Sequence, residues 1–239
     1  MKYEIYRFET LPSTQEFLRK KQGEGRDMLA VAARQTQGKG TKNRSFECAE
    51  GGLWFSLLRF HENALAADAF LMMAKAAVAV AKTLEEYGLV PKIKWANDVL
   101  VGGKKICGIL TENRLCARSL VSTLWGIGLN VNNPLPNELV PIATGLSKEL
   151  GRECALSAVE EKLLSHLDGE FCFSEYVERL AYLGEEVPFE MQGQTFTARL
   201  EGVTERGELV LSKGGVSARY AYGEITVLKN KKDEIRIDE

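Results

Sequence analysis

Apolar residues recur along this chain at two different spacings, and the two spacings predict strands and helices respectively. Runs with a period of two, and short continuous apolar runs bounded by turn residues, predict strands. Such runs occur at residues 3–8, 28–34, 52–58, 92–95, 105–112 and 122–131. The first part of the chain is therefore expected to hold several strands.

Helices are predicted where the apolar spacing changes to three and four residues. The clearest case is residues 64–87, for which Asn63 is a candidate N-cap. Ser13 and Glu16 have the S-x-x-E spacing of a capping box, which predicts that a helix begins there. Residues 135–150 are predicted to form a loop with a short helix. Residues 156–183 are predicted to form one or two amphipathic helices.

After Glu185 the pattern changes to short alternating strands separated by turns. The turn residues are Gly193, Arg206-Gly207, Gly214-Gly215 and Gly223. Many short strands with regular turns are typical of a small β-barrel. We therefore predict a domain boundary near residue 185, followed by a barrel and a charged tail.

Composition limits the partners and the compartment. The 239 residues carry a net charge of −2, whereas a nucleic-acid-binding protein is usually basic. Five cysteines without a CxxC pair are typical of reduced thiols, and two distant histidines argue against a histidine-based metal site. The N-terminus has no apolar signal core, and residues 64–81 contain Asp68 and Lys75, which argues against a membrane span. These features predict a soluble cytoplasmic protein.

Residues 35–46, QTQGKGTKNRSF, combine glycine with positive charge and contain no acid. The spacing of a Walker A loop fails because Ala33 takes the place of its first glycine, and a dinucleotide fingerprint fails because Asn43 takes the place of its third. Glycines nevertheless let backbone N–H groups converge on an anion, and Lys39 and Arg44 add charge. The alternative is a solvated hairpin loop.

Two further clusters contain residues suited to a site. In residues 92–112 the pair Asn97-Asp98 follows a strand, Gly102-Gly103 predicts a hairpin turn, and Lys105 starts a strand that Gly108 interrupts. Residues 126–132, GIGLNVN, form the third cluster. Turn chemistry, a solvated strand end and packing glycines are the alternatives for these residues.

Taken in order, the clusters resemble the biotin protein ligases. The matching motifs are Ser13-Thr14-Gln15, the loop at 35–46, Lys94-Trp95-Ala96-Asn97-Asp98, Lys105-x-x-Gly108-Ile109-Leu110-x-Glu112, and Gly126-x-Gly128-x-Asn130. The glycine pattern at Gly207, Gly215 and Gly223-Glu224-Ile225 resembles the small C-terminal domain of that family. No single motif is decisive, but five in order are specific, and they cover nearly the whole chain.

The resemblance implies an α+β fold, namely a mixed β-sheet with helices packed on one side, like that of class II synthetases, plus an SH3-like β-barrel. It implies a catalytic domain at 1–185 and the SH3-like domain with its tail at 186–239, without the DNA-binding domain of some relatives. It also implies two reactions. Biotin and Mg-ATP give biotinoyl-5′-AMP and pyrophosphate, and the adenylate then acylates a lysine of a biotin carboxyl carrier domain.

The same resemblance assigns roles to individual residues. Lys105 and Arg44 are the expected catalytic residues. The expected biotin-binding residues are Ser13, Thr14, Gln15, Gln35, Gly38, Lys39, Lys105, Gly108 and Gly126. The expected ATP- or adenylate-binding residues are Lys39, Gly40, Thr41, Arg44, Phe46, Asn97, Lys105, Leu129 and Asn130. Asp98 and Glu112 are candidate Mg²⁺ ligands or neighbours of the ion.

The chain departs from the family pattern at several positions. Thr41 replaces an arginine, Lys39 keeps a charge without the guanidinium fork, and Phe46 replaces a tryptophan. Gln15 replaces an asparagine, and Ala96 a proline. We expect these changes to preserve the activity, and Thr41 to speed release of the adenylate.

Other functions are carried as alternatives. A lipoate or octanoate ligase or transferase shares the fold, but an aliphatic acyl chain gives Ser13, Thr14 and Gln35 no hydrogen-bond partners. A non-catalytic nucleic-acid or carrier-binding module would use the barrel and the basic loop, and a biotin-sensing regulator would need a DNA-binding domain. The sequence names no particular carrier and leaves a monomer or a homodimer open.

Overall fold

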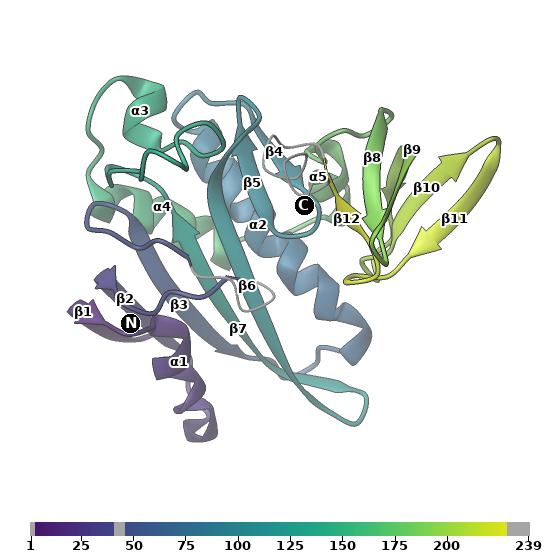
Figure 1. Ribbon diagram of the computed structural model, residues 1–239. Helices are drawn as coiled ribbons and strands as arrows, with labels where there is room; N and C mark the ends of the chain where they lie inside the picture. Colours follow the sequence, from purple (N-terminus) through teal and green to yellow (C-terminus); the bar gives the residue numbers. More distant parts are fainter. Residues whose placement is uncertain (1–2, 41–45, 229–239) are drawn as a thin grey trace.

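The computed structural model describes residues 3–40 and 46–228, and their strands form two sheets (Figure 1). The larger sheet has seven strands in the order β1-β2-β3-β7-β6-β5-β4. The smaller sheet has five, in the order β11-β10-β9-β8-β12. Thr41 and Arg44, both predicted for the site, lie outside the described residues.

The seven-stranded sheet is mixed, as expected. Only β1 and β2 pair in parallel, and every other neighbouring pair is antiparallel. Each of the six apolar runs before residue 135 forms a strand, and the predicted turn at Gly102-Gly103 joins β5 to β6. The strands are β1 (Glu4–Leu11), β2 (Met28–Gln35), β3 (Leu53–Phe60), β4 (Pro91–Lys94), β5 (Asp98–Val101), β6 (Lys104–Cys116) and β7 (Ser119–Leu129).

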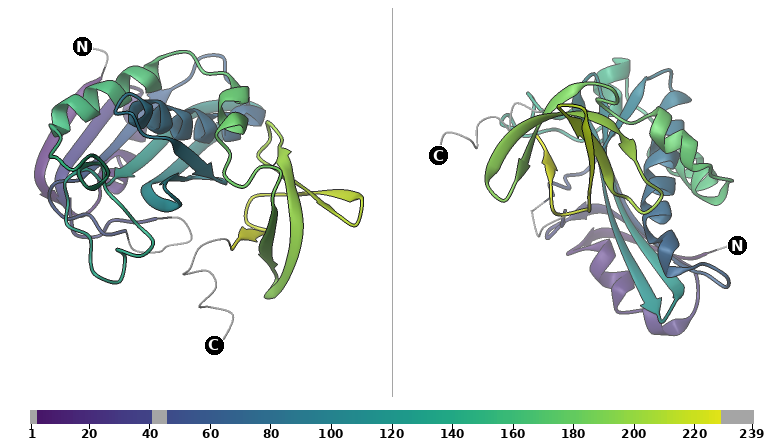
Figure 2. Two further views of the ribbon diagram at one scale, coloured as in Figure 1. Left: turned by 90° about the horizontal axis from the view of Figure 1, so that it is seen from above. Right: turned by 90° about the vertical axis from the view of Figure 1, so that its right-hand side faces the viewer.

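Most of the helical mass covers one face of this sheet, as Figure 2 shows from above. The helices are α1 (Thr14–Arg19), α2 (Ala69–Glu85), α3 (Leu146–Leu150), α4 (Leu156–Asp168) and α5 (Phe173–Glu178). The main core lies under α2, α4 and α5, where Leu57 of β3 is buried. Because successive strand residues point to opposite faces, the next residue, Leu58, packs instead with Leu18 of α1. The short helix α1 therefore lies on the other face of the sheet.

The starts of two helices test the predicted caps. Ser13 caps α1, since its hydroxyl accepts the Glu16 N–H at 3.3 Å. The predicted cap Asn63 is wrong because the backbone near it pairs with the start of β7, through a bond from the Leu120 N–H to the Ala64 carbonyl at 2.9 Å. A 3-10 turn at Ala66–Asp68 follows, and α2 begins only at Ala69.

The second sheet is antiparallel and begins at Glu186, and the predicted glycine turns lie between its strands. A small antiparallel sheet is compatible with the expected SH3-like fold, and the division into domains at residue 185 stays a prediction. Its strands are β8 (Glu186–Met191), β9 (Gln194–Val203), β10 (Leu209–Lys213), β11 (Val216–Tyr220) and β12 (Thr226–Val227). No helix within residues 3–40 and 46–228 is long and apolar enough to cross a membrane.

Aromatic residues of the larger sheet and its helices hold the second sheet in place. The Trp95 indole N–H donates to the Gly207 carbonyl at 3.2 Å, and the Trp95 ring meets Tyr222 edge to face with centroids 5.6 Å apart. A side chain at Gly207 would collide with Phe70 of α2, at 2.4 Å. One hydrophobic cluster accordingly includes both Trp95 and buried residues of the second sheet.

Candidate functional site

A cleft on the α1 face of the seven-stranded sheet brings together eleven of the predicted site residues. The space between its walls, including the open mouth, is about 510 Å³. The predicted residues that line it are Ser13, Thr14, Gln15, Gln35, Lys39, Gly40, Phe46, Asn97, Lys105, Gly108 and Gly126. They come from α1, β2, the loop after β2, the β4–β5 turn, β6 and β7.

Glycines form the floor of the cleft where β6 and β7 pair. Gly108 lies opposite Gly128 in the register, and the Phe46 ring occupies the space that side chains there would need. A Cβ at Gly128 would come within 2.6 Å of Phe46 Cε1, and one at Gly126 within 2.4 Å of Gln15 Oε1. The bare backbone thus lets an aromatic ring and an amide lie directly on the sheet.

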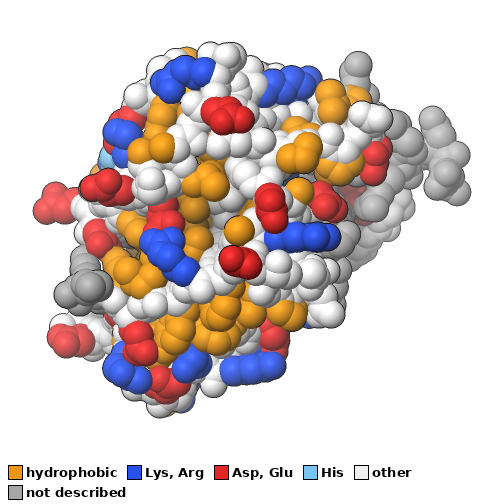
Figure 3. Space-filling view, turned by 90° about the vertical axis from the view of Figure 1, so that its left-hand side faces the viewer, with side chains coloured by type: hydrophobic (Ala, Val, Ile, Leu, Met, Phe, Trp, Pro, Cys, Tyr) orange, Lys and Arg blue, Asp and Glu red, His pale blue; other side chains and the backbone are white. Residues whose placement is uncertain are grey.

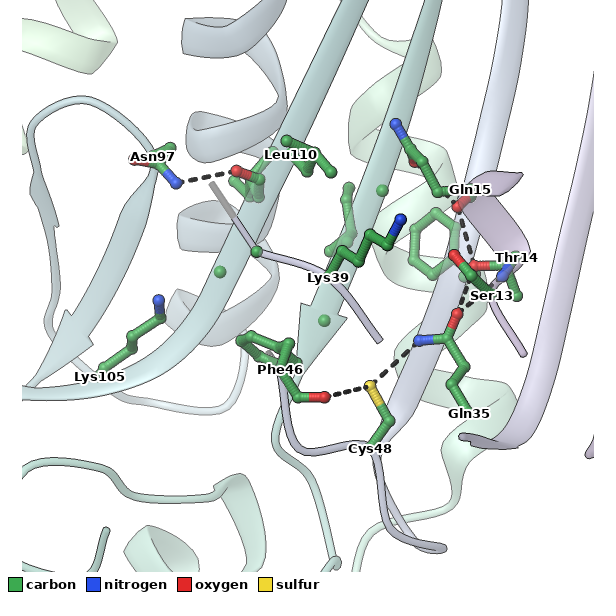
Figure 4. Close-up of a pocket in the computed structure, with 18 residues that line it drawn as sticks. Ser13, Thr14, Gln15, Gln35, Lys39, Phe46, Cys48, Asn97, Lys105 and Leu110 are labelled. Atoms are coloured by element: carbon green, nitrogen blue, oxygen red, sulfur yellow. Dashed lines mark hydrogen bonds between the residues drawn. The ribbon is translucent and has the colours of Figure 1, made fainter. Parts of the chain in front are cut away.

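A continuous chain of polar side chains forms one wall (Figure 4). The Gln35 amide N–H donates to Cys48 Sγ at 3.1 Å, and Gln35 Oε1 accepts from Thr14 N at 2.7 Å and from Thr14 Oγ1 at 3.0 Å. Thr14 Oγ1 lies 2.8 Å from Ser56 Oγ, which donates to Gln15 Oε1 at 3.1 Å. Thr14, Gln15 and Ser56 are almost fully buried, so these bonds fix the wall.

This wall has more acceptors than hydrogens along the two hydroxyls. Thr14 and Ser56 each carry a single O–H hydrogen. Three oxygen-to-oxygen contacts would each need one of these two hydrogens. They join Thr14 to Gln35, Thr14 to Ser56, and Ser56 to Gln15. One contact therefore lacks a hydrogen at any moment. The wall is suited to a ligand that supplies N–H donors.

Lys105 and Asn97 lie across the cleft from this wall (Figure 4). The Lys105 ammonium is 2.7 Å from Asp98 Oδ1 and 5.5 Å from the centroid of the Phe46 ring. Asn97 donates from its amide to the Ile109 carbonyl at 2.9 Å, and its own carbonyl accepts the Ile109 N–H at 3.0 Å. A held cation thus faces a wall of neutral acceptors.

Gly38 does not line the cleft. It lies where the two ends of the segment 35–46, here called the glycine loop, come together. Its carbonyl accepts the Phe46 N–H at 2.9 Å. A Cβ on Gly38 would come within 2.6 Å of both Cys48 Sγ and the Phe46 carbonyl oxygen. The two ends of the loop can therefore approach each other only because residue 38 has no side chain.

The structure does not bring Leu129 and Asn130 to the cleft, although both were predicted to contact the nucleotide. Leu129 is fully buried in the main core. Asn130 is 6% exposed, donates to the Thr144 carbonyl at 3.0 Å and accepts from the Asn133 amide at 3.1 Å. Its side chain shapes the loop after β7, because turn amides bond readily to nearby backbone.

The two carboxylates predicted as Mg²⁺ ligands are also separated. Asp98 pairs with Lys105, whereas Glu112 pairs with Arg19 at 2.6 Å. Asp98 lies opposite Gly108 in the register, and four residues of strand, roughly 13 Å, separate Gly108 from Glu112. Within the described residues no group of three or more His, Cys, Asp or Glu side chains could hold a metal ion. The two carboxylates do not form a joint site.

Several lining residues escaped the sequence analysis, above all Ser56 and Cys48. Ser56 had a detectable signal, because it is the one hydroxyl in the apolar strand LWFSLL. Cys48 had none, since its contact with Gln35 depends on how the loop returns. Burial raises the pKa of the Cys48 thiol to about 11, so the thiol is neutral near pH 7. The other lining residues not predicted are Phe55, Ile109, Leu110, Ile127 and Gly128.

Known proteins resemble the chain in sequence. The Biotin/lipoate A/B protein ligase family matches residues 7–132. The bifunctional ligase/repressor BirA of Bacillus subtilis is 40% identical over 141 residues, which are 57% of this chain and 43% of that protein. The biotin--[acetyl-CoA-carboxylase] ligase of Mycobacterium tuberculosis is 28% identical over 219 residues, 84% of this chain and 79% of that protein. The match to the Bacillus protein thus spans less than half of its length.

Solved structures resemble the fold over nearly the whole chain. The biotin protein ligase of Aquifex aeolicus, in complex with biotin and ATP, superimposes with a TM-score of 0.77 at 28% identity. That superposition covers 94% of this chain and 98% of the Aquifex chain. The mixed sheet, the helices and the second sheet are therefore shared with that protein.

Proposed function

This chain belongs to the Biotin/lipoate A/B protein ligase family, and from that premise we propose that it is a biotin protein ligase that activates biotin with ATP. The observation that carries the proposal is the cleft, in which an acceptor-rich wall faces a held ammonium group. Its neighbours in sequence and structure include ligases named for biotin. We propose a biotin carboxyl carrier domain as the acceptor.

Two steps follow from this assignment. In the first, a carboxylate oxygen of biotin attacks the α-phosphorus of ATP, the bond to the β-phosphate oxygen breaks, and pyrophosphate leaves. In the second, the amine of a carrier lysine attacks the acyl carbon, the bond to AMP breaks, and the nitrogen loses a proton. The product is an amide between biotin and the carrier.

Lys105 is the residue we assign to the reacting phosphate. The first step brings a carboxylate against a phosphate, so a fixed positive charge lowers its barrier. Asp98 holds the Lys105 ammonium at 2.7 Å, and the Phe46 ring lies beside it. Lys105 is therefore oriented before a ligand arrives, which reduces the reorganisation needed during the reaction.

The polar wall is the part we assign to the ureido ring. A ureido group offers two N–H donors and one carbonyl acceptor. The hydrogen-bonded row from Gln35 through Thr14 and Ser56 to Gln15 has only two hydroxyl hydrogens for three contacts, so its oxygens keep lone pairs that a bound N–H can use.

Mg²⁺ enters this scheme with ATP rather than as a resident ion. Of the two predicted carboxylates, Asp98 lies beside Lys105 and suits a cation that accompanies the phosphates, whereas Glu112 is engaged by Arg19. Mg²⁺ keeps most of its waters and uses few protein carboxylates. When bound, it neutralises phosphate charge. The unpaired cysteines agree with the reducing cytoplasm that we propose as its compartment.

Two alternatives make different predictions. Lipoate and octanoate carry no N–H donors in their acyl chains, so they make no use of the acceptors along the polar wall. A nucleic-acid-binding module needs a surface of one charge. On the face in Figure 3 the described acidic and basic side chains are interspersed. The first point favours biotin over the aliphatic acids, and the second argues against a nucleic-acid surface on that face.

Pyrophosphate exchange tests the proposal. The purified protein is mixed with Mg-ATP and biotin, with lipoate and octanoate in parallel. We expect exchange with biotin alone, and a loss of about 100-fold or more in Lys105→Ala. Lys104→Ala is the matched control, since Lys104 bonds the Val140 carbonyl and does not line the cleft. Exchange with lipoate or octanoate instead would assign the other branch of the family, and no exchange with any acid would refute the enzyme assignment.

A further inference from the structure

Glu112 lies next to Gln15, the last residue of the polar wall, and links Gln15 to Arg19 by hydrogen bonds. Its carboxylate accepts two bonds from the Arg19 guanidinium, at 2.9 Å to Oε2 and 2.6 Å to Oε1. Oε1 also accepts from the Gln15 amide nitrogen at 3.1 Å. The bonds from Arg19, followed by that from Gln15, lower the pKa of Glu112, although partial burial opposes them. Glu112 is therefore an anion at neutral pH.

An anionic carboxylate can only accept hydrogen bonds, and this fixes which way the Gln15 amide points. The amide nitrogen must face Glu112, so Oε1 must face the opposite way. There it accepts from Ser56 Oγ at 3.1 Å and lies over Gly126 on the floor of the cleft. The amide nitrogen also donates to the Leu124 carbonyl at 3.4 Å, so Glu112 makes the shorter of the two contacts that hold this orientation.

The orientation of Gln15 is transmitted along the wall. Because Ser56 donates its only hydrogen to Gln15 Oε1, its oxygen can only accept at the 2.8 Å contact with Thr14. Thr14 must then choose between Ser56 and Gln35 for its single hydrogen. The order of donors and acceptors along the wall thus begins where Glu112 and the Leu124 carbonyl hold the Gln15 amide. Arg19, whose side chain is only partly exposed, at 38%, stabilises the negative charge of Glu112.

We propose that Glu112, held by Arg19, is a positioning residue that fixes the amide of Gln15 and so sets the preference of the cleft for ligands with N–H donors. This inference rests on the proposed biotin-binding function of the same wall. It replaces a role in metal binding, because both Glu112 oxygens already accept from Arg19.

The variant Glu112→Gln keeps the shape of the side chain and makes it able to donate. We expect its dissociation constant for biotin, measured by titration calorimetry, to rise about 10- to 100-fold, the usual effect of losing a hydrogen bond to a charged group. In pyrophosphate exchange the KM for biotin should rise in parallel, whereas the KM for ATP should change less than about twofold.

The chain offers a matched control for the loss of an ion pair. Arg7 of β1 and Glu160 of α4 make the same two-bond pair, at 3.0 and 2.6 Å, and neither residue lines the cleft. Glu160→Gln therefore removes a comparable pair without touching the wall. We expect it to bind biotin within about twofold of the wild type.

A double-mutant cycle separates positioning from general support of the fold. Gln15→Met removes the amide at nearly constant volume. In that background Glu112→Gln should change biotin affinity by less than about twofold, because the group it orients is gone. The preference for biotin over a biotin methylated on its ureido nitrogens should fall in Glu112→Gln, whereas a purely structural role would weaken both ligands equally.

Each outcome decides the inference. Unchanged biotin binding in Glu112→Gln overturns it, as does an equal loss in Glu160→Gln or a full additional loss in the Gln15→Met background. A raised requirement for Mg²⁺ with unchanged biotin affinity overturns it in favour of a metal ligand. If Glu112→Gln does not fold, Arg19→Met must weaken biotin binding by itself, or the inference fails. Wild-type protein that binds no biotin refutes the proposed function as well.

Discussion

The ring of Phe46 lies in the space that a side chain at Gly128 would occupy, because a Cβ there would come within 2.6 Å of Phe46 Cε1. The ring also meets Trp54 edge to face, with centroids 5.9 Å apart. Phe46 thus bridges the exit of the glycine loop and the floor of the cleft. Its position depends on the absence of a side chain at residue 128.

Gly128→Ala should therefore displace Phe46 and slow adenylate formation. We expect kcat/KM in pyrophosphate exchange to fall about fivefold or more, since overpacking costs about 1–3 kcal/mol. Gly23→Ala is the control, because a Cβ there meets nothing within 4 Å. In a Phe46→Ala background Gly128→Ala should have no further effect. A full additional loss there would show that the glycine matters for another reason.

Asp98→Asn should leave Lys105 in place but less firmly oriented. The 2.7 Å ion pair becomes a weaker contact, so we expect kcat for pyrophosphate exchange to fall about tenfold. The KM for biotin should change much less, because the polar wall is untouched. Kinetics at saturating ATP and varied Mg²⁺ check this. A loss that excess Mg²⁺ restores would show that Asp98 acts through an ion beside the phosphates rather than by orienting Lys105.

Alkylation should distinguish the cysteines by burial and charge. Cys116 and Cys172 are exposed, whereas Cys48 is buried and its pKa is raised to about 11. Below that pH the Cys48 thiol stays protonated, and only thiolates react readily. Iodoacetamide at pH 7.5 followed by peptide mass spectrometry should label Cys116 and Cys172 but not Cys48. Rapid labelling of Cys48 at that pH would contradict the environment described for it.

Glu112 should make the stability of the protein depend on acid. The ion pair with Arg19 lowers the pKa of Glu112 in the folded state. The charged carboxylate therefore stabilises the fold at pH values above 4.5, the ordinary pKa of a glutamate. That stabilisation is lost as the pH falls through the lowered folded value. Urea unfolding should therefore show wild type more stable than Glu112→Gln at pH 7, with the gap closing below about pH 4.5. A gap independent of pH would exclude the charge as its cause.

Trp95→Phe should loosen the second sheet. The substitution removes the donor of the 3.2 Å bond to the Gly207 carbonyl, which then lies buried without that partner. We expect a loss of about 1–3 kcal/mol in the free energy of unfolding, measured in urea. An unchanged midpoint would show that the contact with Tyr222 is sufficient by itself.

The order of strands and helices was largely predictable because each element repeats a simple spacing. Ser13 and Glu16 predicted the start of α1 correctly, since a cap is a local feature. Asn63 failed as a cap because the backbone beside it pairs with β7, more than 50 residues away in the chain. Long-range pairing of this kind leaves no trace in local spacing.

The site was predictable mainly through the order of its motifs. Three residues of those motifs, Ser13, Gln35 and Lys105, line one cleft, while the ligand roles predicted for them stay predictions. They did not predict that Asn130 turns its amide into the loop after β7, because a buried amide and a ligand-binding amide look the same in sequence. Ser56 was missed although a lone hydroxyl in an apolar strand marks a position where burial needs a partner.

The junction at Trp95 also bears on how this protein could be engineered. Asn97, which lines the cleft on the side of Lys105, follows Trp95 by two residues, and the Trp95 indole bonds Gly207. Removing residues 186–228, to keep only the seven-stranded sheet and its helices, would expose Trp95 and Phe70 to water close to Asn97. A chimera that took its C-terminal segment from a relative would have to supply a matching turn at position 207. Shortening or exchanging that segment is therefore a change to the scaffold of the cleft itself.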